Sequence, residues 1–130
     1  MTLLQAIAHM EGFYTLGDRP NRNNNPGDLS WGTEAQAFGA THGDPRFAVF
    51  PDPTTGWIAL KRWLSVPAKF DASGELVGGY LGATLEQAIN RFAPPIENNT
   101  ATYLATVIQN TGLSASSILT SFMLETPEAE

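Results

Sequence analysis

The sequence has no cysteine, only two histidines and no long apolar run, and each absence excludes a kind of site or segment. Without cysteine there is no disulfide bond, no thiolate metal site and no cysteine nucleophile, so packing alone must hold the fold together. His9 and His42 lack the spacing of metal ligands, so we expect no metal and no other cofactor. Because no stretch is long enough to span a bilayer, we also expect no contact with a membrane.

Basic residues are few as well. The sequence has seven Lys and Arg and 13 Asp and Glu, which gives a net charge of −6. Because it contains no basic patch, we expect no nucleic-acid partner. The N-terminus has neither the basic start nor the apolar run of a secretory signal, so we expect the protein to be made in the cytoplasm. At 130 residues and 42% hydrophobic content, we expect one monomeric domain at residues 1–124 and a flexible acidic tail at 125–130.

Apolar residues at helical spacing predict five helices, at residues 3–12, 56–65, 85–92, 100–110 and 115–124. Three strand-like segments, at 28–31, 37–42 and 47–50, predict a small antiparallel sheet after the first helix. Gly43-Asp44-Pro45 is typical of the turn between the last two of these strands. We expect the glycine-rich segment at 74–82 to be a loop. The predicted fold class is therefore α+β, mainly α.

Glu11 is an acid in the last turn of the first predicted helix. It lies four residues after Ile7 and seven after Leu4, so it shares their inward face. Partial burial and the negative end of the helix dipole both disfavour a charged carboxylate, so both raise the pKa of Glu11. A general acid that works near neutral pH needs a raised pKa. The alternative is that Glu11 is solvated at a frayed helix end.

A polar segment follows this acid, at residues 13–32. Its three consecutive asparagines before Pro-Gly are typical of a turn, and their amides can also hydrogen-bond to sugar hydroxyls and N-acetyl groups. Phe13, Tyr14 and Trp31 add flat apolar faces on which a sugar ring can stack. An acid, amides and aromatic rings within so short a stretch indicate a sugar-binding site. The alternative is an ordinary surface turn beside core aromatic residues.

The order of these features resembles the lysozyme-like superfamily, in which a helix ending in a catalytic glutamate precedes a small sheet and several helices. The segment ENNTATYLATV, at 97–107, is similar to a signature of the soluble lytic transglycosylases and their phage relatives. NNPGDL, FAVFPDPTTG and APPIENNT resemble small phage and prophage muralytic enzymes. The resemblance covers residues 4–118. The chain departs from the larger transglycosylases in having Glu11-Gly12 where they have Glu-Ser, and NNPGDLSWG in place of their Gly-Met-Gln strand.

The resemblance implies a glycosidase that cleaves the β-1,4 bond between N-acetylmuramic acid and N-acetylglucosamine in peptidoglycan, as a lytic transglycosylase or a muramidase. It implies that Glu11 protonates the glycosidic oxygen and that Tyr103 bonds to Glu11 or to substrate. Such a protein reaches the bacterial wall after release or as part of a virion. We expect a cleft between the sheet and the C-terminal helices. The expected substrate-binding residues are Asn24, Asn25, Asp28, Trp31, Thr41, Phe47 and Glu97.

Glu97 has a second interpretation, because it precedes a helix and can pair with Arg91 or cap backbone amides. A second carboxylate near the sugar would let water attack and leave a reducing end. Without one, the muramic 6-hydroxyl attacks and gives a 1,6-anhydro product, the outcome that the resemblance favours. The candidates for this carboxylate are Asp18, Asp28, Glu34 and Asp44.

Two other functions fit the same fold, because fold does not fix function. One is a non-catalytic protein that binds the cell wall or builds a virion. The other is a chitinase-like glycosidase.

Overall fold

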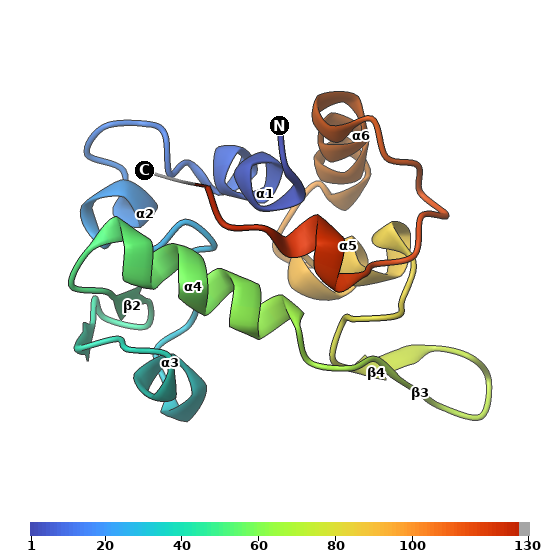
Figure 1. Cartoon of the computed structure of the whole chain (residues 1–130), viewed down its shortest axis with the longest axis horizontal. Coiled ribbons are helices and arrows are strands. Elements are labelled where there is room, and N and C mark those ends of the chain that lie inside the picture. Colours follow the sequence, from blue (N-terminus) through green and yellow to red (C-terminus); the bar gives the residue numbers. More distant parts are fainter. Residues whose placement is uncertain (128–130) are drawn as a thin grey trace.

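In the computed structural model, which describes residues 1–127, helices dominate and two short hairpins interrupt them (Figure 1). The helices are α1 (Leu3–Glu11), α2 (Arg19–Arg22), α3 (Thr33–Ala37), α4 (Pro53–Leu64), α5 (Leu85–Phe92), α6 (Thr100–Thr111) and the 3-10 helix η1 (Ser121–Leu124). The antiparallel hairpins are β1 (His42–Gly43) with β2 (Ala48–Val49), and β3 (Lys69–Phe70) with β4 (Leu76–Gly78). The predicted α+β, mainly α class is confirmed. Part of the expected flexible tail, residues 128–130, lies outside the described residues.

Capping side chains set the bounds of the long helices. Thr2 forms a capping box with Gln5 at the start of α1, and Gly12, with a φ of 94°, ends the helix in the left-handed region. A second capping box, at Thr84, starts α5 at the predicted residue. Helix α4 begins three residues earlier than predicted, because the Asp52 carboxylate accepts a hydrogen bond from the Thr55 amide and so caps the helix ahead of Pro53.

The first predicted sheet is smaller than expected. Residues 33–37 form α3, which was not predicted and which overlaps the expected strand at 37–42 only at Ala37, because Thr-Glu-Ala-Gln-Ala contains good helix formers and no alternation of apolar residues. Only His42 and Gly43 pair as a strand, with Val49 and Ala48. The predicted strand at 28–31 contributes a single bridge, between Ser30 and Phe47.

Two further predictions are wrong in the C-terminal half. The glycine-rich segment expected to be a loop contains β4, which pairs with β3 across a turn closed by the Asp71 carboxylate. The helix expected at 115–124 is reduced to η1. Its first half is extended because the Leu85 amide donates to the Ser117 carbonyl and Thr84 bridges to Ile118. These long-range bonds compete with the local bonds of a helix.

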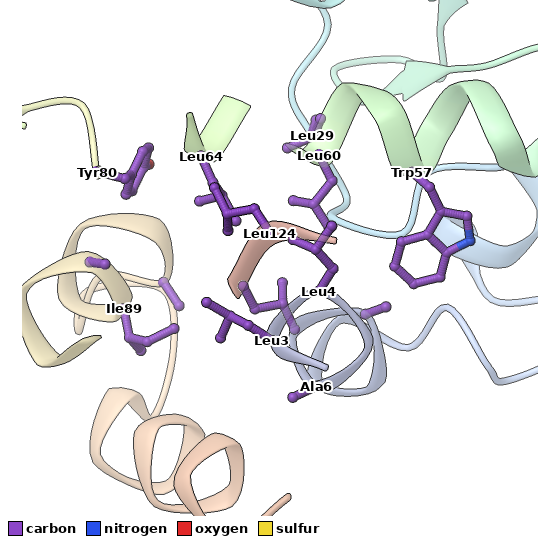
Figure 2. Close-up of a cluster of buried hydrophobic side chains, with 14 of the residues drawn as sticks. Leu3, Leu4, Ala6, Leu29, Trp57, Leu60, Leu64, Tyr80, Ile89 and Leu124 are labelled. Carbon is purple, nitrogen blue, oxygen red and sulfur yellow. The ribbon is translucent and has the colours of Figure 1, made fainter. Parts of the chain in front are cut away.

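The core lies where α1, α4, α5 and η1 meet. Figure 2 shows Leu4 of α1, Leu60 and Leu64 of α4 and Leu124 of η1 converging with Ile89 of α5, all at most 1% exposed. Helix α1 also packs along α6. None of the helices among residues 1–127 has the length and apolar character to cross a membrane.

Helix α4 links the two halves of the structure. Figure 1 shows it extending from the side of α2 and β2 to the side of the β3–β4 hairpin. The asparagine-rich loop lies directly on its first turns, where a β-carbon at position 56 would lie 1.9 Å from the Asn24 carbonyl oxygen. Gly56 is therefore required for this close approach of loop and helix. The loop then passes to Asp28, whose φ of 47° turns the chain toward β2.

Asn25 fastens this loop from inside. Its side chain is fully buried, and its amide nitrogen donates hydrogen bonds to the carbonyls of Leu29 (3.0 Å) and Ala48 (2.9 Å). Its side-chain oxygen accepts a hydrogen bond from the Leu29 amide at 2.9 Å. One side chain thus satisfies three buried backbone groups and joins the loop to β2.

We expect Asn25→Ala to lower the free energy of unfolding by about 3 kcal/mol, because three buried backbone groups lose their partner. The measurement is urea unfolding followed by circular dichroism. Asn90→Ala is the matched control, because Asn90 is exposed on α5 and its amide bonds only within that helix. We expect the control to change stability by less than about 0.5 kcal/mol. Equal unfolding midpoints for both variants would contradict the role given to Asn25.

Candidate functional site

A cleft of about 680 Å³ lies at the C-terminal end of α1. Its walls come from two parts of the chain, residues 19–47 and residues 63–98, and Glu11 joins them. Its lining includes both aromatic rings and charged side chains. This combination of apolar faces with a few placed polar groups is typical of a small-molecule or glycan site. The chemistry of the cleft therefore depends on Glu11 and on the side chains around it, where the two parts of the wall meet.

Glu11 is held by a tyrosine from the far end of the chain. The Tyr103 hydroxyl donates a hydrogen bond of 2.7 Å to Oε2 of Glu11, across 92 positions of sequence. Tyr103 lies on α6 and is 3% exposed. Because α1 and α6 pack side by side, the contact is part of the helix interface. The carboxyl group is thereby fixed in orientation at the edge of the cleft.

The surroundings of Glu11 bring its pKa into the neutral range, so that a large share of the molecules keep the proton at pH 7. Burial is the largest influence and raises the pKa of Glu11 from 4.5 to about 7. The Tyr103 hydrogen bond opposes burial by stabilising the anion, the negative charge of Asp28 raises the pKa further, and Arg19 lowers it. Burial and the neighbouring Glu11 hold the pKa of the Tyr103 hydroxyl well above its usual value. Tyr103 therefore stays a hydrogen-bond donor while Glu11 titrates.

Asp28 and Arg19 form a rigid part of the cleft wall. Arg19 Nε lies 3.0 Å from Asp28 Oδ1, and its Nη2 bonds to the other carboxylate oxygen. The same guanidinium stacks on Phe47, with Cζ 3.6 Å from the ring centroid. The Asp28 side chain is 6% exposed, so little of it faces water. Both of its oxygens are occupied by one paired cation.

The structure brings five of the predicted site residues together. Glu11, Asp28, Phe47 and Glu97 line the cleft, and Tyr103 bonds to Glu11 from behind. The expected pairing of Glu97 with Arg91 is absent from the ion pairs of residues 1–127. Asn99, not Glu97, caps α6. Glu97 is thus an exposed acid on the rim of the cleft.

The other four predicted substrate-binding residues lie outside the cleft lining, and the structure contradicts the prediction for Asn25, which is fully buried. Asn25 is buried and its amide is fully used by backbone. Asn24 donates to the Phe50 carbonyl at 3.0 Å and lies outside the cleft lining. Trp31 packs on the backbone of Gly43, and Thr41 bonds to the Val49 carbonyl on the outer hairpin. These side chains build the loop and the hairpin that support the cleft wall.

Of the candidates for a second carboxylate, only Asp28 reaches the cleft. Asp18 and Glu34 are exposed outside it. Asp44 is paired with Arg22 at 2.9 Å, a hydrogen bond that lowers the pKa of Asp44. No group of three His, Asp or Glu within residues 1–127 is placed to hold a metal ion.

Sequence reasoning missed much of the lining. Trp63, Tyr80 and Phe92 supply aromatic faces, and Arg46 and Arg91 supply charge. The aromatic residues were assigned to the core or a loop, because a helical face that borders a cleft has the same periodicity as one that borders the core. No local signal marked the arginines. No protein-family model matches the chain, and no curated protein sequence matches it.

Replacing Tyr103 with phenylalanine should raise the pKa of Glu11 further above 7, because the lost hydrogen bond favours the charged form. The titration can be followed by carbon NMR of the glutamate carboxyl groups. Tyr80→Phe is the control, because it removes a hydroxyl from the same cleft and leaves the Tyr103 bond intact. A Glu11 pKa that falls in Tyr103→Phe would refute the role of this hydroxyl.

Replacing Glu11 with glutamine should stabilise the fold at high pH only. A folded-state pKa of about 7 against 4.5 means that the contribution of Glu11 to stability is fully present below pH 4.5 and lost as pH rises through 7. The variant should match the parent at pH 4 and exceed it by roughly 3 kcal/mol at pH 9. Urea unfolding at several pH values measures the gap. A constant gap at all pH values would mean that Glu11 is solvated.

Proposed function

We propose that this protein is a peptidoglycan-degrading glycosidase and that Glu11 is its general acid. The observation that carries the proposal is a carboxyl group with a pKa near 7, fixed by a tyrosine at the edge of a cleft lined by aromatic rings. A general acid is most effective when its pKa lies near the working pH. Glycosidases protonate the leaving oxygen with a carboxyl group whose pKa is raised by burial beside the sugar-binding cleft.

The order of the chain supports the same proposal. The resemblance to the lysozyme-like superfamily implies a glutamate at the end of the first helix and a tyrosine from the ENNTATYLATV segment beside it. Glu11 is the last residue of α1, and Tyr103 of that segment donates to it. The resemblance was drawn from sequence motifs alone, so the contact across 92 residues is an independent reason to prefer it.

In the proposed reaction, the proton is on Oε1 of Glu11, because Oε2 accepts the bond from Tyr103. Glu11 gives this proton to the glycosidic oxygen as the bond from that oxygen to C1 of N-acetylmuramic acid breaks. The muramic 6-hydroxyl then bonds to C1 and returns its proton to the Glu11 carboxylate. The product carries a 1,6-anhydro ring, and the acid is restored.

The state of Asp28 supports this internal attack over attack by water. An enzyme that uses water needs a second carboxylate free to act as base or nucleophile. Asp28 is the one of the expected candidates that lines the cleft, and Arg19 occupies both of its oxygens. The remaining acid of the lining, Glu97, is exposed on the rim and is not held beside Glu11 by any ion pair of the described residues. We therefore propose the lytic transglycosylase reaction, with muramidase activity as the alternative.

Glu11→Gln should reduce the rate of peptidoglycan digestion by at least about 100-fold, the usual effect of removing a positioned acid. The rate is measured as turbidity loss of permeabilised cells. Glu34→Gln is the control, because Glu34 is exposed on α3 outside the cleft, and it should digest at the parental rate. In the parent, the rate should fall as pH rises above 7, because Glu11 loses its proton. Lysis by Glu11→Gln at the parental rate would refute the assignment.

Mass spectrometry of the released sugars separates the alternatives. A 1,6-anhydro product is one water lighter than the product with a reducing end, which would point to a muramidase. A parent protein that binds purified peptidoglycan and releases no fragments would be the non-catalytic wall-binding protein. Cleavage of chitin oligomers without cleavage of peptidoglycan would indicate the chitinase-like activity.

A further inference from the structure

The cleft is rich in arginine although the protein is acidic. The chain carries a net charge of −6 and only five arginines, yet three of them, Arg19, Arg46 and Arg91, line the cleft. Neither lysine does. The few cations of the sequence are thus concentrated where a ligand would bind, against the sign of the whole molecule.

Two of these guanidinium groups are free of carboxylate partners. Arg19 is neutralised by Asp28, whereas Arg46 and Arg91 form no ion pair among the residues that the structure describes. The Arg46 guanidinium lies 5.5 Å from the ring centroid of Phe47. Arg91 lies 5.4 Å from the ring centroid of Tyr80, interacts with the hydroxyl of that residue, and donates a hydrogen bond of 3.5 Å to the Val77 carbonyl. Both arginine side chains are exposed, and neither has a carboxylate partner, so each guanidinium group has donors left for a ligand.

The charges that remain in the cleft are positive on balance. Asp28 and Arg19 cancel, and Glu11 is uncharged below its pKa of about 7. This leaves Arg46 and Arg91 against Glu97 alone. Each free arginine lies beside an aromatic ring, and the two come from the two different parts of the wall. A sugar ring on the aromatic face would bring its substituents to the guanidinium group beside it.

We infer that Arg46 and Arg91 are specificity-determining residues of the cleft, which bind carboxylate groups on the glycan and so favour an acidic glycan over a neutral one. The planar guanidinium group matches a carboxylate with two parallel hydrogen bonds, a geometry that a neutral N-acetyl group cannot complete. The inference rests on the proposed function, since it assumes that the cleft holds a glycan. In peptidoglycan, the carboxylate belongs to the attached peptide or, where muramic acid carries no peptide, to its free lactyl group.

The test measures binding in Glu11→Gln, which keeps the glycan intact. Isothermal titration calorimetry compares three tetrasaccharides of alternating N-acetylglucosamine and N-acetylmuramic acid. One has free lactyl carboxylates, one has them converted to neutral methylamides, and one carries peptides on them. Arg46→Gln and Arg91→Gln are each added to this background. Arg62→Gln is the matched control, because Arg62 is exposed on α4 outside the cleft lining.

We expect an acidic tetrasaccharide to bind about tenfold more tightly than the methylamide at low ionic strength, and each cleft arginine variant to lose about fivefold of that affinity. The affinity for the methylamide should change by less than about twofold in the cleft arginine variants. In the Arg62→Gln control, the affinity for every ligand should stay within about twofold of that of Glu11→Gln alone. Added salt should reduce the difference in affinity between the acidic and the neutral tetrasaccharides, since both arginines are exposed. A preference limited to the peptide-bearing ligand would support the inference and assign the carboxylates to the peptide.

Equal affinity for the acidic and neutral ligands, or arginine variants that weaken both alike, would overturn the inference. The inference would also be overturned if none of the three ligands bound. These results are distinct from failure of the proposed function. Loss of lysis in Glu11→Gln together with equal affinities would keep the glycosidase and remove the arginine role. An arginine-dependent preference together with normal lysis by Glu11→Gln would do the reverse.

Discussion

The rest of the site depends on one contact, the hydrogen bond from Tyr103 to the buried carboxyl group of Glu11. A carboxyl group this far from water is unfavourable as an anion, and the fold accepts that penalty at the end of α1. Gly12 ends the helix immediately after the acid, which lines the cleft. Helix α6 packs along α1 and supplies the one hydroxyl that fixes its orientation. The burial of Glu11, its position at the end of α1 and its hydrogen bond with Tyr103 thus act together on one carboxyl group.

Local chemistry explains which parts of the fold could be read from the sequence. Helices α1, α5 and α6 were predicted nearly to the residue, because their caps and apolar stripes are short-range signals. The segments at 37–42 and 115–124 were misassigned for different reasons. For the first, the local signal of the short helix of strong helix formers at 33–37 was overlooked. The second is held away from helical geometry by bonds between Ser117 and the start of α5, and no window of neighbouring residues contains that information.

The same distinction applies to the site. Glu11 and Tyr103 could be proposed from the helical face and the motif resemblance, and the structure places them in contact. Asn25 was mistaken for a ligand-binding group, since an amide that hydrogen-bonds sugar is chemically the same as one that hydrogen-bonds backbone. Only the burial of Asn25 shows which role it has. The free arginines were missed for the opposite reason: exposed arginine is ordinary in a sequence, and what distinguishes Arg46 and Arg91 is the cleft they share.

The separation of 92 positions between Glu11 and Tyr103 also has a consequence in time. A chain emerging from the ribosome forms α1 early, whereas α6 is added when most of the sequence has been made. Until then the Glu11 carboxyl group meets water and titrates like any surface glutamate. Contacts between such distant residues are among the slowest to form, so the pair of Glu11 and Tyr103 is a late product of folding. A nascent or clipped chain that lacks α6 therefore has Glu11 without the hydroxyl that fixes its carboxyl group, and only the completed fold gives this acid its surroundings.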